Sequence, residues 1–561
     1  MIIQQLRRQC LQNPLKPQYG GGIIVNPEFN DGLQGWSQFG EAKLEHRESQ
    51  LSSGNKFIAA HTRKQPYDSI SQRLYLHKNK LYTFSAWIQV TRSGNVTVTA
   101  VFKTSSGFKH AGSTIAESNC WSMLKGGLTV DESGPAQLYF ESNNTSVEIW
   151  VDSVSLQPFT ARQWMSHQHQ SIEKAHKKKV RIQAVDSKGH PIPNATITVQ
   201  QKRPSFPFGC AINKNILNNT PYQNWFTSRP FTVTTFEDEM KWYSTERSQG
   251  NVDYSVSDAM LQFAKRHRIS VRGHNVFWDD PRRQPGWVDS LSRKQLALAA
   301  SRRLNSIMSR YRRQVIAWDL VNENLHFDFF ERRVARNASA IFYNWAKKAD
   351  GTTTLYMNDY NTIEESGDTA SSPGRYMRKI REIKRFGGNR NVKMGIGIEG
   401  HFSGNAPPNL PYMRAAIDTL ATARLPIWIT EVDVQNNPNQ AWYLEQILRE
   451  ARSHPHVNGI VLWAAWRAEG CYRMCLTDNN FRNLPTGDVV DRLLHEWGWK
   501  QETTSFGATN ANGSFETTLF HGDYHVQVSH PKLGKNCSGL VRTTLNVDPT
   551  STPVFLLRVS G

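Results

Sequence analysis

Two glutamates each end a short apolar run, and their positions indicate acid–base chemistry. Glu323 ends the run VIAWDLVNE, which begins at Val315, and Glu431 ends LPIWITE, which begins at Leu425. Runs of this length with β-branched and aromatic residues predict buried strands. A lone glutamate at a strand end is usually a solvated residue. Two glutamates in equivalent positions indicate carboxyl groups that act together.

The separation of these glutamates in the sequence indicates how they face each other. Glu431 lies 108 positions after Glu323 (431 minus 323). If one β/α unit of a parallel barrel takes about 30 to 40 residues, this separation is three units and places the second carboxyl group across the barrel mouth. Two facing carboxyl groups can hydrolyse a glycosidic bond, because one donates a proton and the other acts as nucleophile or base.

The region around the glutamates predicts a (β/α)8 TIM barrel over residues 204–499. Helical periodicity fills the intervals between short apolar runs, as at 294–311 and 441–452. Eight such runs alternating with helices are typical of this barrel, whose reactive groups lie at the carboxyl ends of its strands. The runs lie near Phe208, Phe231, Ser270, Val315, Thr353, Lys393, Pro426 and Gly459.

Polar and aromatic side chains follow five of the other predicted strands, where a barrel would carry its site. They are Glu237, Lys241, His274, Trp278, Asn358, Asp359, Glu399, His401, Trp463 and Trp466. Aromatic residues at a barrel mouth are often only packing residues. Beside two glutamates, this set indicates a cleft that binds sugars.

Six stretches of this region resemble a known family. They are EDEMKW (237–242), RGHNVFW (272–278), WDLVNE (318–323), GIGIEGHF (395–402), ITEVD (429–433) and CYRMCLTDNNF (471–481). The first five are similar to motifs of family-10 glycoside hydrolases, and the sixth resembles the plant members, which are endo-1,4-β-xylanases. The resemblance implies that Glu323 is the acid/base, that Glu431 is the nucleophile, and that the reaction retains the anomeric configuration.

The neighbouring residue types suit these implied roles. Glu323 must hold a proton at working pH, and an apolar strand end would raise its pKa as required. Glu431 must stay ionised, and we expect His401, backed by Asp433, to orient its carboxylate. Asn322 is suited to the sugar 2-hydroxyl, a contact that strengthens in an oxocarbenium-like transition state.

The resemblance also implies a sugar-binding subsite beside the catalytic pair. It would be lined by Glu237, Lys241, His274, Trp278 and Glu399, with Trp463 and Trp466 as an apolar platform. The sequence departs from the family pattern at Asp238, where Asn is common, at Asp279, where many members have His, and at Glu399, where bacterial members have Gln. These departures concern substrate binding and the local pKa balance, whereas the catalytic pair is intact.

Residues 22–158 predict a β-sandwich. Short alternating stretches are separated by Gly, Ser and Asn turns, and no helical periodicity lasts. The opening 25–36 and the closing VEIWVDSVSL (147–156) resemble family-22 carbohydrate-binding modules. That resemblance implies a sugar site at Tyr139 and Glu141, with Tyr67 near the place where such modules often present Trp. An inert structural β-domain is the alternative.

The flanks of the barrel predict a further small domain. Residues 159–177 are polar and show no apolar face, so we interpret them as a linker. Residues 179–201 alternate as a two-stranded hairpin, which is marginal alone, and further alternating runs come only after the barrel. Together these segments resemble the small β-sandwich beside carboxypeptidases. We expect 178–203 and 500–561 to form one discontinuous sandwich; the alternative is a separate C-terminal β-domain with the hairpin packed on the barrel.

Charge and hydropathy narrow the choice of partners. The 561 residues include 67 basic and 48 acidic side chains, a formal net charge of +19. Zinc-finger spacing, RNA-binding aromatic motifs and basic repeats are absent, so we expect an acidic polysaccharide and no nucleic acid. The family resemblance implies that this polysaccharide is xylan or glucuronoarabinoxylan. No run of 18 apolar residues predicts a membrane span. We expect a monomer.

Cysteines and sequons bear on metal binding and localisation. Of six cysteines only Cys471 and Cys475 are close in sequence, which suggests a loop disulfide, and no metal site and no cofactor are expected. The first residues lack the apolar core of a signal peptide. Glycosylation triplets nevertheless fit a secreted glycoprotein of the cell wall. They begin at Asn95, Asn143, Asn144, Asn194, Asn218, Asn337, Asn512 and Asn536.

Three functions therefore compete. The first is an endo-xylanase that acts on cell-wall xylan. The second is a wall protein with weak catalysis that binds polysaccharide, and the third is a β-glucanase on the same scaffold. Both glutamates favour an enzyme, because a binding protein has no use for a proton-donor environment. Only the subsite residues distinguish xylan from glucan.

Overall fold

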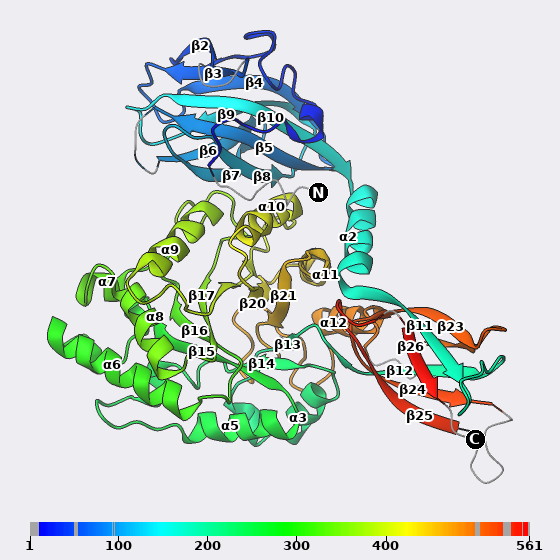
Figure 1. The fold of residues 1–561 in the computed structure, drawn as a ribbon. Helices are drawn as coiled ribbons and strands as arrows, with labels where there is room; N and C mark the ends of the chain where they lie inside the picture. The colour runs from blue at the N-terminus through cyan, green and yellow to red at the C-terminus, as the bar shows by residue number, and fades with distance from the viewer. Residues whose placement is uncertain are drawn as a thin grey trace.

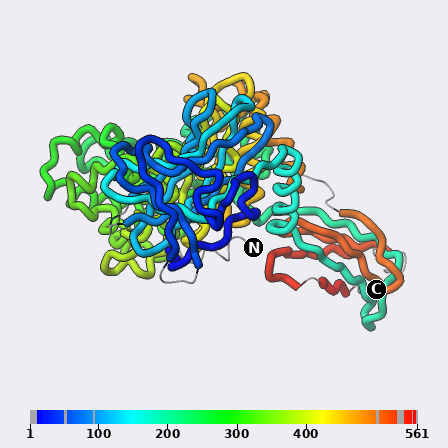
Figure 2. The backbone as a smooth tube through the Cα atoms, turned by 90° about the horizontal axis from the view of Figure 1, so that it is seen from above, coloured from blue at the N-terminus to red at the C-terminus, as the bar shows by residue number. Residues whose placement is uncertain are grey.

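The protein is described by a computed structural model over residues 10–49, 54–91, 94, 96–499, 505–530, 540–552 and 554–558. The sequons at Asn95 and Asn536 lie outside these ranges. Figure 1 shows an N-terminal β-sandwich, a central barrel, and a small β-sandwich that carries the C-terminus. In Figure 2 the N-terminal sandwich lies over the barrel, and the small sandwich stands to one side.

Alternating apolar side chains build the N-terminal sandwich from two five-stranded sheets, as expected. Their orders are β1-β4-β9-β6-β7 and β2-β3-β10-β5-β8. The turn η1 (Gln18–Gly21) precedes β1 (Ser37–Phe39), β2 (Lys43–Glu48), β3 (Lys56–His61), β4 (Ser69–Leu76), β5 (Lys80–Val90), β6 (Val96–Thr104), β7 (Gly107–Ala116), β8 (Ser122–Leu128), β9 (Gly134–Glu141) and β10 (Ile149–Thr160). Side chains such as Phe84, Phe102 and Leu138 fill the core between the sheets.

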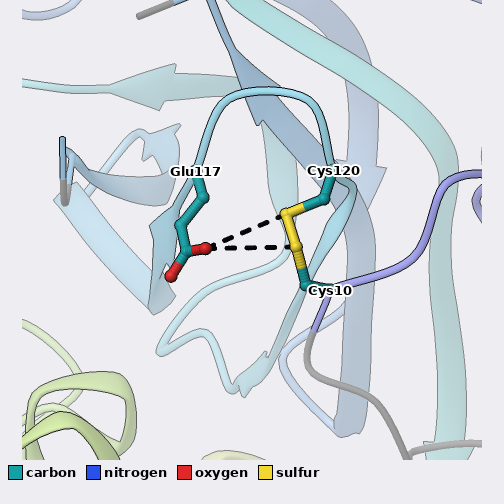
Figure 3. A group of neighbouring side chains, drawn as sticks. All are labelled: Cys10, Glu117 and Cys120. Carbon is teal, nitrogen blue, oxygen red and sulfur yellow. Dashed lines mark hydrogen bonds between the residues drawn. A yellow bond between two sulfur atoms is a disulfide. The ribbon is translucent and has the colours of Figure 1, made fainter. Parts of the chain in front are cut away.

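A disulfide fixes the N-terminal segment to this sandwich. Cys10 is bonded to Cys120, which follows β7, and a carboxylate oxygen of Glu117 lies 4.0 Å from both sulfurs (Figure 3). Leu11 and Trp121, the next residues in the chain, exchange two backbone hydrogen bonds. This pairing spans 110 positions, so spacing alone could not indicate it.

The segment interpreted as a linker is a helix, which corrects that expectation. Helix α2 (Ala161–His176) begins with a capping box, in which the side chains of Thr160 and Gln163 each accept a hydrogen bond from the other residue's backbone N–H. Trp164, Gln168, Ile172 and His176, spaced four residues apart, form its buried face.

The expectation was wrong because half of that face is polar. Its polar side chains form hydrogen bonds with partners on α11 (Gln440–Ser453). The side-chain nitrogens of Trp164 and Gln168 each donate to Glu450 Oε2 over 2.7 Å. His176 Nε2 lies 2.8 Å from the carbonyl oxygen of Arg452. The helix therefore packs on the barrel along its length.

The barrel contains the eight expected parallel strands. They are β13 (Phe208–Cys210), β14 (Val233–Thr235), β15 (Ser270–Trp278), β16 (Ala317–Asn322), β17 (Thr354–Asp359), β18 (Met394–Ile398), β20 (Ile427–Val434) and β21 (Val457–Leu462), with the short β19 (His401–Phe402) beside β20. Neighbours in the chain are neighbours in the sheet, and the ring closes between β13 and β21. The carboxyl ends of these strands therefore meet at one mouth.

Helices surround this ring (Figure 1). Besides α11 they are η2 (Lys214–Leu217), α3 (Thr220–Thr227), α4 (Trp242–Thr245), α5 (Ser255–Arg266), η3 (Pro281–Arg283), η4 (Gly286–Val288), α6 (Arg293–Arg310), α7 (Phe329–Arg333), α8 (Ala338–Ala349), α9 (Pro373–Arg385), α10 (Leu410–Ala421) and α12 (Pro485–Glu496). None of the helices in the described part of the chain is long and apolar enough to span a membrane.

The small sandwich is built from strands on both sides of the barrel in the sequence. Its sheets have the orders β23-β11-β26 and β22-β12-β24-β25. The strands are β11 (Lys177–Val185), β12 (Thr196–Pro204), β22 (Ser505–Ala508), β23 (Ser514–Phe520), β24 (Gly522–Ser529), β25 (Leu540–Val547) and β26 (Val554–Arg558). The expected hairpin is wrong, because β11 and β12 lie in different sheets and do not pair with each other. Each of them instead pairs with strands beyond residue 500, and Ile182, Ile197 and Val528 share one core.

Candidate active site

Glu431 lies near the carboxyl end of β20 and is surrounded by groups that favour its charged form. His401 Nε2 lies 3.6 Å from Glu431 Oε2, and His274 Nδ1 lies 3.8 Å from Oε1. Asn358 Nδ2 donates to Oε1 over 3.0 Å. Burial alone would raise the pKa of Glu431, but His274, His401 and Lys241 outweigh it and lower that pKa to about 2. Glu431 is therefore an ionised carboxylate at neutral pH.

Glu323 occupies the opposite kind of environment in the same cleft. It follows β16 directly, in a left-handed backbone conformation with φ of 58°, and its N–H donates to the Asn358 carbonyl. Burial raises the pKa of Glu323 to about 7; Asp359 and Glu431 add to this rise, whereas Trp278 and Lys241 oppose it. Glu323 can thus carry a proton near neutral pH.

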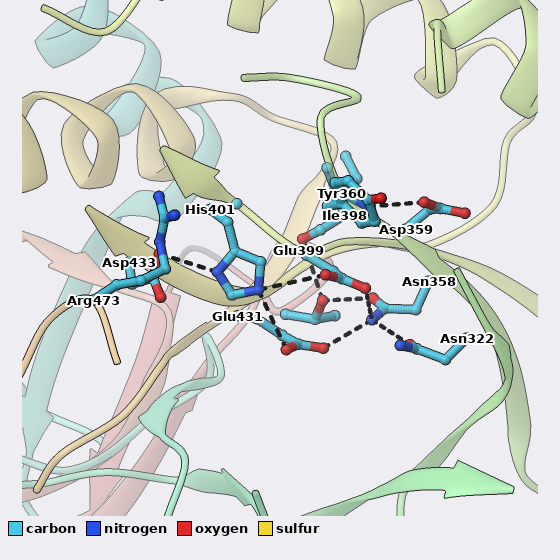
Figure 4. A network of polar contacts seen from close by, with 12 residues as sticks. Asn322, Asn358, Asp359, Tyr360, Ile398, Glu399, His401, Glu431, Asp433 and Arg473 are labelled. Atoms are coloured by element: carbon cyan, nitrogen blue, oxygen red, sulfur yellow. Dashed lines mark hydrogen bonds and ion pairs between the residues drawn. The ribbon is translucent and has the colours of Figure 1, made fainter. Parts of the chain in front are cut away.

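A hydrogen-bond network joins the strand ends between the two glutamates (Figure 4). Asn358 Nδ2 lies within hydrogen-bond distance of Asn322 Oδ1, Glu399 Oε1 and Glu431 Oε1, at 2.9, 3.2 and 3.0 Å. His401 Nε2 lies 3.4 Å from Glu399 Oε2. Burial, with Glu431 and Glu323 nearby, holds the pKa of Glu399 well above its usual range. Asn322 is therefore fixed beside the nucleophile, as its implied role requires.

Several residues expected at the sugar subsite contact one another on the cleft wall. Lys241 Nζ lies 4.3 Å above the Trp278 ring, 5.8 Å from the Trp463 ring and 3.2 Å from Asp238 Oδ1. Burial lowers the pKa of Lys241, but Asp238 and the other nearby acidic groups reverse this and leave it raised. Glu237 accepts hydrogen bonds from Asn213 and Arg467.

These side chains line one cleft of about 570 Å³. Of the barrel residues expected at the site, the structure places Glu237, Lys241, His274, Trp278, Asn322, Glu323, Glu399, His401, Glu431, Asp433 and Trp463 on its wall. A cleft of this size with two carboxyl groups of opposite protonation suits general acid catalysis beside a nucleophile.

Trp466 does not belong to this wall, which corrects its expected role as a platform. Its ring packs on Tyr222 and Phe481, with centroids 5.3 and 4.9 Å away, and its indole N–H donates to Asn479. Only 7% of Trp466 is exposed. Its side chain is part of the buried core of the barrel, against which Phe481 packs.

The expected sugar site of the N-terminal sandwich is partly covered. Tyr139 is buried, its hydroxyl donates to Glu141 Oε1 over 2.6 Å, and the ring of Phe39 stacks on it at a centroid distance of 3.9 Å. Tyr67 is 42% exposed, and its ring meets Phe39 edge-on. Phe108, which is 59% exposed, also meets Tyr139 edge-on, so Tyr67 and Phe108 are the exposed rings beside Tyr139, and neither Phe39 nor Phe108 was expected.

Sequence reasoning assigned no role to several residues that the site uses. Asn358 was visible only as a polar residue at a strand end. His326 lies between Asp359 and Asp368 and stacks on Tyr360, a cleft residue, at 3.8 Å between centroids. Only the convergence of separate strands reveals these contacts, although the Asp319–Arg272 pair that holds His274 does lie inside two quoted motifs.

Comparison with known proteins agrees with this geometry. The profile of Glycosyl hydrolase family 10 matches residues 198–486, just over half of the chain, and a Carbohydrate binding domain profile matches residues 21–146. Endo-1,4-beta-xylanase 5 of Arabidopsis thaliana is 44% identical over 84% of this chain and 82% of its own length. Endo-1,4-beta-xylanase 4 of the same plant is 41% identical over 82% and 83%.

Among solved structures, xylanase 10B from Thermotoga petrophila RKU-1 in complex with xylobiose is 21% identical, covers 52% of this chain and 95% of its own, and has a TM-score of 0.46. The family assignment depends on the profile match and on the Arabidopsis relatives, which span most of this chain. The chain belongs to glycosyl hydrolase family 10.

Proposed function

We propose that this chain is an endo-1,4-β-xylanase that cleaves internal bonds of xylan and retains the anomeric configuration. One observation carries the proposal: a single cleft holds Glu323, buried and able to keep its proton, and Glu431, ionised and surrounded by donors. A retaining glycosidase needs this division of roles. The name shared by the Arabidopsis relatives supports xylan as the substrate.

The reaction would proceed in two displacements. Glu431 attacks the anomeric carbon while Glu323 donates its proton to the leaving oxygen, which leaves a glycosyl ester on Glu431. Glu323, now a carboxylate, then takes a proton from water, and that water attacks the anomeric carbon and releases Glu431. Asn322 is placed to hydrogen-bond the sugar 2-hydroxyl, while His401 and Asn358 hold the nucleophile.

Incubation with xylan, mixed-linkage β-glucan and cellulose tests the proposal. We expect xylo-oligosaccharides of several lengths from xylan, with the β-anomer first by NMR, and little product from the glucans. Glu323→Gln and Glu431→Gln should each slow xylan hydrolysis by about 10³-fold or more without unfolding the protein. Glu382→Gln, an exposed change on α9, is the control. Faster cleavage of glucan, binding without hydrolysis, or an α-anomer as first product would overturn it.

We also propose that the N-terminal sandwich binds xylan through Tyr67 and its neighbours. The test uses the full chain carrying Glu431→Gln, which binds without degrading, in a pull-down with insoluble xylan. Adding Tyr67→Ala should release more protein into the supernatant. Phe506→Ala removes a similarly exposed ring, 68% exposed on the small sandwich, and should change nothing. Equal retention of both variants would exclude Tyr67.

A location in the cell wall, and glucuronoarabinoxylan as the natural substrate, remain part of this proposal. The net charge of +19 favours an acidic polymer, and the sequons favour secretion. Mass spectrometry of the protein purified from the secretory pathway of a plant cell should find glycans on exposed sequons. Unglycosylated protein in the cytosol alone would contradict it.

A further inference from the structure

The disulfide loop of the cleft rim is not explained by the proposed reaction. Residues 471–475 lie between β21 and α12, and the bond between Cys471 and Cys475 closes them into a small ring. Tyr472 is 94% exposed, so its side chain gains little from packing, whereas Met474 is 2% exposed. Arg473 stands between them on the wall of the catalytic cleft.

Figure 4 shows Arg473 beside Asp433, with His401 between this pair and the nucleophile Glu431. Its Nε lies 2.7 Å from Asp433 Oδ1, and its Nη2 donates to the carbonyl oxygen of Phe402. Its own carbonyl accepts a hydrogen bond from Gln440 Nε2 over 3.0 Å. The guanidinium is therefore fixed to β19 and β20, the strands that carry His401 and Glu431.

Asp433 connects Arg473 to the nucleophile through His401. The oxygen that meets Arg473 also lies 3.0 Å from His401 Nδ1. The other ring nitrogen of His401 faces Glu431 Oε2 at 3.6 Å and Glu399 Oε2 at 3.4 Å. A shift of the Asp433 carboxylate would rotate the imidazole away from Glu431. An arginine with a 19% exposed side chain prevents that shift only if its backbone is itself fixed.

We propose that the disulfide-closed loop holds Arg473 as a positioning residue for the nucleophile, through Asp433 and His401. This inference rests on the proposed function of the same cleft. The ring restricts the backbone of Arg473 before substrate arrives, so the Asp433 carboxylate and the His401 ring stay in one orientation. Arg473 touches neither the sugar nor the leaving group in this scheme, so it acts on the nucleophile and not on proton transfer.

An aryl xylobioside whose leaving group needs no proton separates these roles. With 2,4-dinitrophenyl β-xylobioside, kcat/KM reports attack by Glu431 alone, so Glu323→Gln should lose little. Arg473→Met should lose between about 10-fold and 100-fold on this substrate and a similar factor on xylan. KM should change less than kcat. Arg473→Lys, which keeps a donor and the charge, should recover part of the loss, and Arg482→Met, an exposed arginine after the loop, should lose nothing.

The disulfide is tested by a double-mutant cycle. Replacement of both Cys471 and Cys475 by Ser should lower kcat/KM in the same direction as Arg473→Met. Adding Arg473→Met to that pair should cost little more, because both changes act through one contact. Circular dichroism and thermal unfolding check that each variant is folded.

The outcomes distinguish failure of this inference from failure of the proposed function. If the wild type hydrolyses neither xylan nor the aryl xylobioside, the proposed function fails. If the wild type is active and folded Arg473→Met matches it, the inference fails. Fully additive losses in the cycle would also overturn the inference, because the disulfide would then act elsewhere. A loss on xylan without a loss on the aryl xylobioside would place Arg473 in proton transfer and contradict it.

Discussion

At the scale of single residues, the division of work between two chemically identical side chains depends on their surroundings. Glu323 is buried and has acidic neighbours, whereas Glu431 faces two imidazoles, an amide and Lys241. The first environment penalises a negative charge and the second stabilises it. The pKa of Glu323 is about 7 and that of Glu431 is about 2, so one proton resides on the acid over a wide range of pH.

The pH dependence of xylan hydrolysis should follow from this difference. Because Glu323 must be protonated to act as acid, kcat/KM should fall as pH rises through about 7. Glu431 is ionised far below this, so activity in mild acid should stay high as long as the fold persists. A kcat/KM profile on xylan measures the alkaline limb. An alkaline limit near pH 5 would show that the environment of Glu323 does not raise its pKa.

Glu323 should also reduce the stability of the folded protein at neutral pH. Its folded pKa of about 7 lies above the ordinary glutamate value, so the folded state binds more protons than the unfolded state between these two values. The folding stability therefore falls as pH rises from the ordinary glutamate pKa toward about 7. Glu323→Gln removes that cost and should stabilise the fold by about 3 kcal/mol at pH 8 but not at pH 4. Denaturant titration at both pH values measures this, and equal effects would contradict it.

The residue scale also shows where sequence reasoning ends. Glu323 and Glu431 could be predicted because each ends an apolar run, and periodicity identifies strand ends. Asn358 could be seen at such an end, yet its three acceptors lie on or directly after three other strands. Trp466 was misplaced because composition cannot tell a ring that faces the cleft from one that faces the core. Residue type and spacing thus locate a site better than they define its contacts.

At the scale of elements, helix α2 shows that a polar segment can be a packed one. Its buried face includes glutamine and histidine, which a hydropathy pattern counts as solvated. Their buried polar groups form hydrogen bonds with Glu450 and the Arg452 carbonyl on α11, a helix about 280 positions away in the sequence. No local pattern contains that information. The discontinuous small sandwich is the opposite case, because alternation is local and continues on both sides of the barrel.

Trp164 should be the residue that fixes α2 to the barrel. It is 6% exposed and its indole N–H donates to Glu450. Trp164→Ala removes a large buried ring and leaves a buried carboxylate with one donor fewer, so we expect a loss of about 3–5 kcal/mol in unfolding free energy. Met165→Ala, at a neighbouring position that is 52% exposed, should cost under about 0.5 kcal/mol. Chemical denaturation measures both, and equal small losses would show that α2 packs only loosely.

At the scale of the whole molecule, the N-terminal sandwich rests on the barrel through a buried ion pair. Strand β8 packs on α10, and Lys125 Nζ lies 2.5 Å from Asp418 Oδ2 across that contact. His454 Nε2 lies 3.2 Å from the other oxygen. Lys125, Asp418 and His454 are all largely removed from solvent. The direction of the N-terminal sandwich relative to the cleft therefore depends on this pair as well as on α2.

Breaking the pair should loosen this contact. Lys125→Met leaves the Asp418 charge buried without its main partner, which costs about 3–5 kcal/mol. Lys125→Met with Asp418→Leu replaces the pair by apolar groups and should recover most of that loss. Lys109→Met breaks an exposed pair with Asp131 inside the sandwich and should cost at most about 1 kcal/mol. Calorimetry gives the stabilities, and small-angle scattering gives the maximum dimension. If the Lys125→Met variant had the stability and the maximum dimension of the wild type, the contact would not depend on this pair.

Acid should separate the two parts for the same reason. Burial would raise the pKa of Asp418, but Lys125 and His454 reverse this and hold it well below its usual range. A carboxyl group with a depressed pKa in the folded state contributes stability that is complete above its unfolded pKa of about 3.9 and is lost as pH falls below that value. As pH is lowered, the maximum dimension of the wild type in small-angle scattering should therefore increase before the circular dichroism signal of the barrel is lost. The Lys125→Met, Asp418→Leu variant has no such carboxylate at the contact, and its maximum dimension should stay constant over the same range. Parallel lengthening of both proteins would assign the acid response to another part of the interface.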